Sequence, residues 1–306
     1  MSAEARPGRV VATMGRRVVV HDEEGDRVCF LAGHRAVVGD EVAWVEVPGE
    51  GGKLVRVLER RTALIRTDPR GKEQVLAANL HGIVVVSAPR EPPFRAGLLD
   101  RYLVAAGVGG LQAIVALNKV DGGVPDGVEA ELALRQAAGV EVLHVSAHEG
   151  TGVAALAARL AEVGPHGGPW ALVGHSGVGK TSLAAALVPG HDVGAIGDLS
   201  EHWGTGQHTT TGSRIFRMPS GAELVDSPGI RTFAPGRLDA EHVRDHFPVV
   251  RDLVCRYRDC LHRAGEDGCT AEQEVPPPLL ASYRRLQAEL TGIDERRRPG
   301  RRRSRT

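Results

Sequence analysis

The feature of this sequence that most restricts its fold is the glycine-rich segment Gly174–Thr181, which reads G-H-S-G-V-G-K-T. It fits the pattern G-x-x-x-x-G-K-[ST], in which backbone N–H groups and the N-terminus of the next helix surround phosphate oxygens. The pattern has this meaning only between a strand and a helix. Apolar Trp170–Val173 precedes it and helix-forming Thr181–Leu187 follows it. The segment predicts an α/β domain that binds a nucleotide; the alternative is a glycine-rich loop that binds none.

Lysine is rare in this chain, with four among 306 residues, and one of the four is Lys180 in the predicted phosphate loop. A compact point charge suits a loop wrapped around phosphates better than the larger, planar guanidinium of arginine. We expect Lys180 to reach the β- and γ-phosphates and Thr181 to bind Mg²⁺. The residues expected to contact the nucleotide here are Gly174, His175, Ser176, Gly177, Val178, Gly179, Lys180, Thr181 and Ser182.

A second motif, N-K-V-D at Asn118–Asp121, follows the apolar run Ile114–Leu117. At the end of a strand it would lie where ligands bind in an α/β sheet. Asp121 would accept hydrogen bonds from N1–H and the exocyclic amine of guanine, a pair of donors that adenine lacks. Lys119 would lie along the base plane, and Asn118 would connect neighbouring loops. A polar turn is the alternative interpretation.

Guanine contacts are also expected after the next predicted strand, where the backbone at Ser146 and Ala147 would donate to O6 of the base. Taken alone, this short sequence is a weak signal. The order of the motifs is more informative. The base-recognition motif precedes the phosphate loop, whereas an ordinary guanine-nucleotide switch protein carries the two in the opposite order.

A third motif, D-S-P-G at Asp226–Gly229, ends another apolar strand. Asp226 would hold Mg²⁺ through water, and the N–H of Gly229 would face the γ-phosphate. The next residue is Ile230, which cannot orient an attacking water as glutamine does in Ras-type proteins. Hydrolysis is therefore expected to be slow, or to use a water-positioning group from elsewhere in the chain.

The candidate for that group is His208, in the glycine- and threonine-rich loop Gly204–Thr211. An exposed loop histidine without a role is the alternative. Thr209 or Thr210 would be the second Mg²⁺ ligand. Catalytic roles are thus expected for His208, Lys180 and Thr210.

A metal site is predicted near the C-terminus, where three of the four cysteines and a histidine fall within fifteen residues: Cys255, Cys260, His262 and Cys269. Three sulfurs and one imidazole fit a closed, tetrahedral zinc site that is structural, because no coordination position stays open. Three incidental cysteines are the alternative. Cys29 has no partner in the sequence and is expected to be a small core residue.

The chain divides into regions of different pattern. Short alternating runs in residues 8–58 predict a small five-stranded barrel of the oligonucleotide-binding or SH3 type, with or without RNA bound to its arginines. From about residue 80, strands alternate with helices, as in a doubly wound α/β sheet. Beyond about residue 236 the chain is expected to be mostly helical, with an amphipathic helix at Leu279–Leu290. The predicted domains are 1–62, 63–235 and 236–295, followed by a tail at 296–306.

Composition agrees with two or three globular domains, because 42% of the 306 residues are apolar and 25% are charged. No apolar run is long enough for a membrane span, and the N-terminus lacks an apolar signal core, so a cytoplasmic protein is expected. Monomer is the default expectation. The net charge is zero, but the tail holds seven arginines and no acid. It is expected to be disordered, either binding RNA or acting as a solubilising end.

Together these residues resemble the circularly permuted, ribosome small-subunit-dependent GTPases of the RsgA/YjeQ family. The similarity covers roughly residues 8–290. Further matching segments are Ala78-Asn79-Leu80, Leu99–Leu103 and the G-x-H-T-T loop around His208. Two departures are His81, where aspartate is common, and a spacing before Cys269 that is one residue longer.

The resemblance implies a multidomain protein with an oligonucleotide-binding barrel, a circularly permuted P-loop GTPase domain and a zinc-containing C-terminal domain. It also implies hydrolysis of GTP to GDP and phosphate with Mg²⁺, and a role of His208 in that step. Its expected partners are the 30S subunit and 16S rRNA during late subunit maturation. An RNA-binding module with a regulatory or slow nucleotide site is the alternative, and an ATP-dependent enzyme is disfavoured by Asn118–Asp121.

Overall fold

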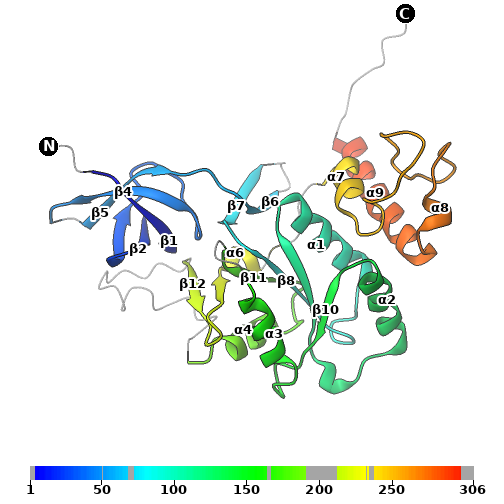
Figure 1. Ribbon diagram of the computed structural model, residues 1–306, viewed down its shortest axis with the longest axis horizontal. Coiled ribbons are helices and arrows are strands. Elements are labelled where there is room, and N and C mark those ends of the chain that lie inside the picture. The colour runs from blue at the N-terminus through cyan, green and yellow to red at the C-terminus, as the bar shows by residue number, and fades with distance from the viewer. Residues whose placement is uncertain are drawn as a thin grey trace, which may run out of the picture.

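The computed structural model describes residues 4–49, 51–67, 72–163, 167–190, 212–231, 233 and 238–297. Figure 1 shows a β-barrel, a central α/β domain and a helical C-terminal domain placed side by side along the longest axis of the molecule. Among the described residues, no helix is both long and apolar enough to span a membrane.

The N-terminal domain is a closed barrel of five strands, as the sequence predicts. Its strands are β1 (Arg6–Met14), β2 (Arg17–Asp22), β3 (Gly25–Phe30), β4 (Glu41–Val47) and β5 (Gly51–Val57). They pair in the order β1-β2-β3-β5-β4, and β1 also pairs with β4, which closes the barrel. Alternating residues such as Val42 and Trp44 face the interior because successive side chains of a strand point to opposite faces. Cys29 is fully buried there, which confirms it as a core residue.

The central domain is a mostly parallel sheet with the spatial order β10-β9-β8-β11-β13-β12. Its strands are β8 (Gly82–Ser87), β9 (Gln112–Leu117), β10 (Glu141–His144), β11 (Trp170–Val173), β12 (Ser213–Arg217) and β13 (Glu223–Asp226). Its helices are α1 (Ala96–Val108), α2 (Asp126–Ala137), α3 (Val153–Ala161), α4 (Lys180–Leu187) and α6 (Pro228–Arg231), with the short 3-10 helix η1 (Val120–Gly122).

Helices cover both faces of this sheet, and strand β8 shows why its sequence is continuously apolar. Ile83 and Val85 pack in one core with residues of α1 and α2. Val84 and Val86 pack in a second core with residues of α3 and α4. A strand buried on both faces has no position for a polar side chain. The predicted doubly wound sheet is therefore confirmed.

The C-terminal domain contains α7 (Ala240–His246), α8 (Ala271–Glu274) and α9 (Pro277–Arg297). The predicted helix at Leu279–Leu290 is confirmed, but it begins earlier and continues to Arg297. Arg296 and Arg297 are therefore helical, which corrects the predicted start of the tail, and the rest of the tail lies outside the described residues.

The C-terminal domain packs on helix α1. Val104 of α1 belongs to the same buried cluster as Tyr283 and Leu286 of α9. Asp100, also on α1, accepts a hydrogen bond from Ser282 of α9 at 2.5 Å and pairs with Arg135 of α2. Asp100 and Arg135 are each 1% exposed, so their charges are compensated only within the protein. Helix α1 is thus fixed to the C-terminal domain as well as to its own sheet.

Two contacts between the barrel and the central domain have no signal in the sequence. The hairpin of β6 (Ala63–Thr67) and β7 (Glu73–Ala78), shown in cyan in Figure 1, lies between the two domains. Strand β1 also pairs with β12 through Ala12↔Arg214 and Thr13↔Ser213, which makes one sheet of eleven strands. Arg9 of β1 reinforces this joint with two hydrogen bonds of 2.7 and 2.8 Å to Glu223. The sequence pattern predicts these domains as separate units and gives no sign of this connection.

A second tight contact joins the barrel to the end of strand β7, at Gly39. Gly39 has φ +89° and lies so close to Ala78 that an added Cβ would be 1.9 Å from the Ala78 carbonyl oxygen. Gly33 has the same φ of +89° with nothing within 4 Å of such a Cβ. Both Gly→Ala variants share the backbone strain, but only Gly39→Ala creates a clash between the barrel and the backbone of β7.

We expect Gly39→Ala to lower the free energy of unfolding by about 2 kcal/mol more than Gly33→Ala does, measured by urea denaturation. Equal losses in the two variants would show that the contact between Gly39 and Ala78 does not hold the joint.

Candidate nucleotide site and metal centre

The predicted phosphate loop connects β11 to α4 at the carboxyl end of the parallel strands. Lys180, the first residue of α4, donates hydrogen bonds of 2.8 Å to the carbonyl oxygens of Gly174 and His175. The ammonium group therefore points back across its own loop. The loop lines a cavity of about 700 Å³, large enough for a small-molecule ligand. Its lining includes all the predicted loop residues except Val178, together with Leu98, Tyr102, Lys119 and Phe233.

Asn118 joins three loops at this cavity. Its Nδ2 donates to the carbonyl oxygen of Val178 in the phosphate loop at 2.9 Å, and its Oδ1 accepts from the N–H of Ala147 at 3.0 Å. The side chain is 1% exposed. Gly179 has φ +94°, and a Cβ there would come within 2.3 Å of Asn118 Nδ2, so the loop needs glycine at this position. The connection expected from the sequence is thus present as two hydrogen bonds.

Asp121 is hydrogen-bonded to Ser146, which the sequence also predicts as a guanine contact. The hydroxyl of Ser146 donates to Asp121 Oδ1 at 2.6 Å. This hydrogen bond is the main cause of a lowered pKa of Asp121, so the carboxylate is ionised at neutral pH and accepts hydrogen bonds. Ser146 therefore orients Asp121 in the structure, in addition to the predicted role of its backbone. Lys119, with φ +67°, donates from Nζ to the carbonyl oxygen of Glu91 at 2.7 Å.

The predicted Mg²⁺ ligands Thr181 and Asp226 come together at a small second cavity, which Lys180, Ser227 and Ile230 also line. Ile230 is 1% exposed and belongs to the main core, so this side chain anchors α6 and carries no group that could orient water. Gly229 lies in α6. The remaining predicted residues of this region, His208, Thr209 and Thr210, lie outside the described residues.

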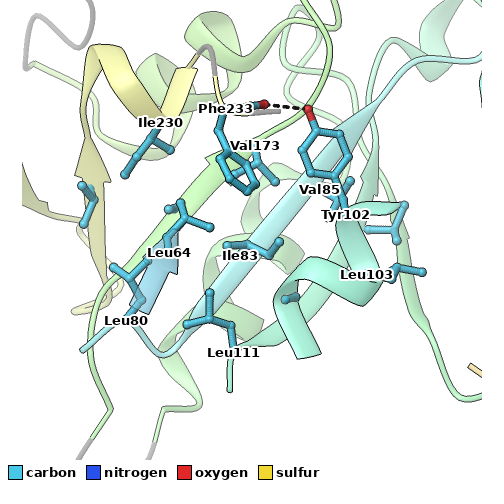
Figure 2. Close-up of a cluster of buried hydrophobic side chains, with 14 of the residues drawn as sticks. Leu64, Leu80, Ile83, Val85, Tyr102, Leu103, Leu111, Val173, Ile230 and Phe233 are labelled. Atoms are coloured by element: carbon cyan, nitrogen blue, oxygen red, sulfur yellow. Dashed lines mark hydrogen bonds between the residues drawn. The ribbon is translucent and has the colours of Figure 1, made fainter. Parts of the chain in front are cut away.

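Two cavity-lining residues, Tyr102 and Phe233, were not predicted as part of the site. Figure 2 shows the Tyr102 hydroxyl pointing to the backbone carbonyl of Phe233, to which it donates a hydrogen bond of 2.9 Å. Helical spacing places Tyr102 on the buried face of α1 with Leu99 and Leu103, so a core position could have been predicted. No sequence signal connects it to Phe233, which is 131 residues away.

The four predicted metal ligands meet in the C-terminal domain. The ligand atoms of Cys255, Cys260, His262 and Cys269 all lie within 4.8 Å of one another. Nδ1 of His262 is 3.4, 3.6 and 3.5 Å from the three sulfurs, in that order. Ligand lengths of about 2.3 Å for Zn–S and 2.0 Å for Zn–N give about 3.5 Å between N and S in a tetrahedron.

The cluster can therefore hold a metal ion, and the longer spacing before Cys269 does not prevent its formation. Backbone hydrogen bonds shape the intervening chain: the N–H of Arg256 donates to the Gly268 carbonyl at 3.0 Å, and that of Cys269 donates to the Glu266 carbonyl at 3.2 Å. His81, the other departure, packs its ring against Trp170, with centroids 4.9 Å apart.

The fold and site define a circularly permuted P-loop GTPase. The strand that leads to the base-recognition motif, β9, comes before the phosphate-loop strand, β11, in the chain, yet both end at one cavity. The chain belongs to the RsgA GTPase family, whose model matches residues 57–235.

Individual relatives agree with this assignment. The chain is 41% identical over 300 residues to the small ribosomal subunit biogenesis GTPase RsgA of Azotobacter vinelandii, covering 92% of this chain and 85% of the relative. It is 40% identical to the protein of the same name from Pseudomonas aeruginosa, covering 94% and 86%. Among solved structures, YjeQ from Thermotoga maritima matches with a TM-score of 0.74 at 25% identity, covering 94% of this chain and 99% of that one. YloQ, a circularly permuted GTPase, shares the fold with a TM-score of 0.71.

Proposed function

We propose that this protein binds the small ribosomal subunit and assists its late maturation, hydrolysing GTP with stimulation by the subunit. The observation that carries the proposal is the similarity over more than nine-tenths of the chain to proteins named small ribosomal subunit biogenesis GTPase. That similarity includes the barrel and the metal-ligand domain as well as the GTPase domain. The proposed partner on the subunit is 16S rRNA, and the protein is proposed to act as a cytoplasmic monomer.

The geometry supports a guanine nucleotide as the ligand. An ionised Asp121, oriented by Ser146, matches the two donors on the edge of guanine. Asn118 of the same motif is hydrogen-bonded to Val178 of the phosphate loop, which keeps the two motifs together. We assign the phosphates to the loop and Lys180, and Mg²⁺ to Thr181, Asp226 and one of Thr209 and Thr210. His208 is the proposed water-positioning residue. Competition of a fluorescent guanine nucleotide by GTP but not by ATP checks the base assignment.

We propose zinc as the ion of the Cys₃His cluster. A set of three thiolates and one imidazole favours zinc over magnesium or calcium, which prefer oxygen. With all four tetrahedral positions filled by the protein, such an ion would stabilise the fold of residues 255–269 and take no part in hydrolysis.

The proposed function predicts nucleotide-dependent affinity for the subunit. The D-S-P-G motif is attached to the barrel, since Ser227 accepts a hydrogen bond of 2.8 Å from Ser213, and the N–H of Ser213 donates to Thr13 Oγ1 of β1 at 3.1 Å. A change at the γ-phosphate therefore has a direct physical connection to an RNA-binding domain. We expect purified 30S subunits to bind the protein more tightly with a non-hydrolysable GTP analogue than with GDP. Equal affinities in sedimentation binding assays would contradict the proposal.

A further inference from the structure

The hydrogen bond between Tyr102 and Phe233 connects two parts of the nucleotide cavity. Tyr102 is 3% exposed and Phe233 is 2% exposed. Their rings also pack together, with centroids 5.9 Å apart. Burial raises the pKa of Tyr102 to about 12, an effect that a backbone hydrogen bond with Gly174 partly opposes. The hydroxyl is therefore protonated at neutral pH and donates to the Phe233 carbonyl.

Phe233 lies four residues after Gly229, so this contact fixes the far end of the segment that holds the D-S-P-G motif. The near end is fixed because β13, which ends at Asp226, pairs with both β11 and β12. Between them, Ile230 is buried in the same core as Tyr102 and Phe233 (Figure 2). The contacts at the far end are the Tyr102 hydroxyl, the buried side chains of Ile230 and Phe233, and a backbone hydrogen bond of 3.0 Å from Phe233 to the Ile230 carbonyl.

Helix α1, which carries Tyr102, is held in position by contacts with α2 and α9. Asp100, two residues earlier, is bound by Arg135 of α2 at 2.7 and 2.8 Å and by Ser282 of α9. Arg101 forms an ion pair of 2.8 Å with Glu289 of α9. Movement of α1 would break a buried ion pair, which is costly. The Tyr102 hydroxyl is therefore held in place relative to the sheet and the phosphate loop.

We propose that Tyr102 is a positioning residue for GTP hydrolysis: by holding the Phe233 carbonyl it keeps Asp226 and Gly229 in a single arrangement on the γ-phosphate side of the cavity. The inference rests on the roles proposed above for these two residues. Tyr102 does not itself act on the reacting atoms. It raises the fraction of molecules in which Asp226 and Gly229 have the arrangement needed for hydrolysis.

The test is Tyr102→Phe, which keeps the buried ring and removes only the hydroxyl. We expect the single-turnover rate of GTP hydrolysis, with protein in excess, to fall about fivefold, as for the loss of a hydrogen bond of about 1 kcal/mol. GDP affinity is expected to stay within about twofold, because GDP has no γ-phosphate for the segment to meet.

Tyr283→Phe is the matched control. Tyr283 is fully buried in the C-terminal domain, and its hydroxyl donates to the Leu261 carbonyl at 2.8 Å. The Tyr283 hydroxyl also accepts a hydrogen bond of 2.5 Å from Gln287 Nε2. Tyr283→Phe is therefore expected to lower the melting temperature at least as much as Tyr102→Phe does, but only Tyr102→Phe should slow hydrolysis. The proposal is overturned if Tyr102→Phe hydrolyses GTP at the wild-type rate, if both variants slow it equally, or if GDP affinity falls in proportion.

The assay contains no ribosomes. A failure of 30S subunits to stimulate hydrolysis would contradict the proposed function. The comparison of the two tyrosine variants would still test the role of Tyr102, because it does not depend on the subunit.

Discussion

Replacing Lys180 by alanine is expected to reduce GTP hydrolysis by at least about a hundredfold, as removal of a transition-state donor does in other enzymes. The ammonium group is already placed over the phosphate loop by hydrogen bonds to Gly174 and His175. Its removal deletes the positive charge assigned to the β- and γ-phosphates. The measurement is the single-turnover rate of hydrolysis together with the affinity for GTP.

Two further variants make this prediction specific. Lys180→Arg keeps the charge but is expected to be nearly as inactive as Lys180→Ala, because the planar guanidinium does not fit the tight loop. Lys53→Ala removes an exposed lysine of the barrel and should leave hydrolysis unchanged. An active Lys180→Arg enzyme would mean that the loop does not enclose this side chain as described.

Loss of the metal is expected to unfold the segment that contains Cys255–Cys269. Structural zinc in small zinc domains contributes about 10–16 kcal/mol at neutral pH, more than such a short segment gains from its own contacts. We expect Cys260→Ala to lose its bound zinc, to become sensitive to proteases near residue 260 and to bind 30S subunits at least tenfold more weakly. Zinc content by elemental analysis and limited proteolysis measure the first two effects.

Cys29→Ala is the matched control for this prediction. Cys29 lies in the core of the barrel, outside the metal cluster, and burial raises the pKa of its thiol to about 11, so the thiol is neutral at neutral pH. The Cys29→Ala variant is expected to retain one zinc per chain and its protease resistance in the C-terminal domain. If Cys260→Ala keeps the ion, or if the wild type binds none, the assignment of a structural zinc site is wrong.

Strand positions are easiest to predict from the sequence where a strand is buried on both faces and accepts only apolar residues. Strand β11 coincides with the apolar run Trp170–Val173, and β9 ends with the apolar run Ile114–Leu117. Both strands are buried on both faces, and a polar motif directly follows each of them. The β6–β7 hairpin was missed because it is short and carries exposed polar residues such as Glu73 and Gln74. The apolar runs of the hairpin, Ala63–Ile65 and Val75–Ala78, are only three and four residues long.

Contacts between distant segments could not be predicted from local patterns. The motifs predict which residues meet the nucleotide. The structure places Lys180 and Asp226 at a shared cavity and connects Asn118 to the phosphate loop through Val178. The pairing of β1 with β12 rests on two residue pairs 200 or more positions apart and leaves no periodic signal. The same is true of Tyr102 and Phe233, since a side chain that binds a backbone carbonyl places no restriction on the type of the second residue.

These contacts alter the view of how the three domains are connected. Sequence order suggests that the D-S-P-G motif acts on the C-terminal domain, because it leads directly into that domain. In the structure the motif and the residues after it are connected to both neighbours. Ser227 reaches the barrel through Ser213, and Phe233, four residues after the motif, contacts α1, on which the C-terminal domain packs. The barrel and the C-terminal domain are therefore both connected to the side of the site that we assign to the γ-phosphate.

GTP turnover with and without purified 30S subunits, for the wild type and for His208→Ala, is the decisive measurement for the proposed function. We predict that 30S subunits accelerate hydrolysis by the wild type, and that His208→Ala retains nucleotide affinity but loses the stimulated turnover. Wild-type turnover that is unchanged by 30S subunits would contradict the proposed function, and full stimulation of His208→Ala would remove His208 from the mechanism.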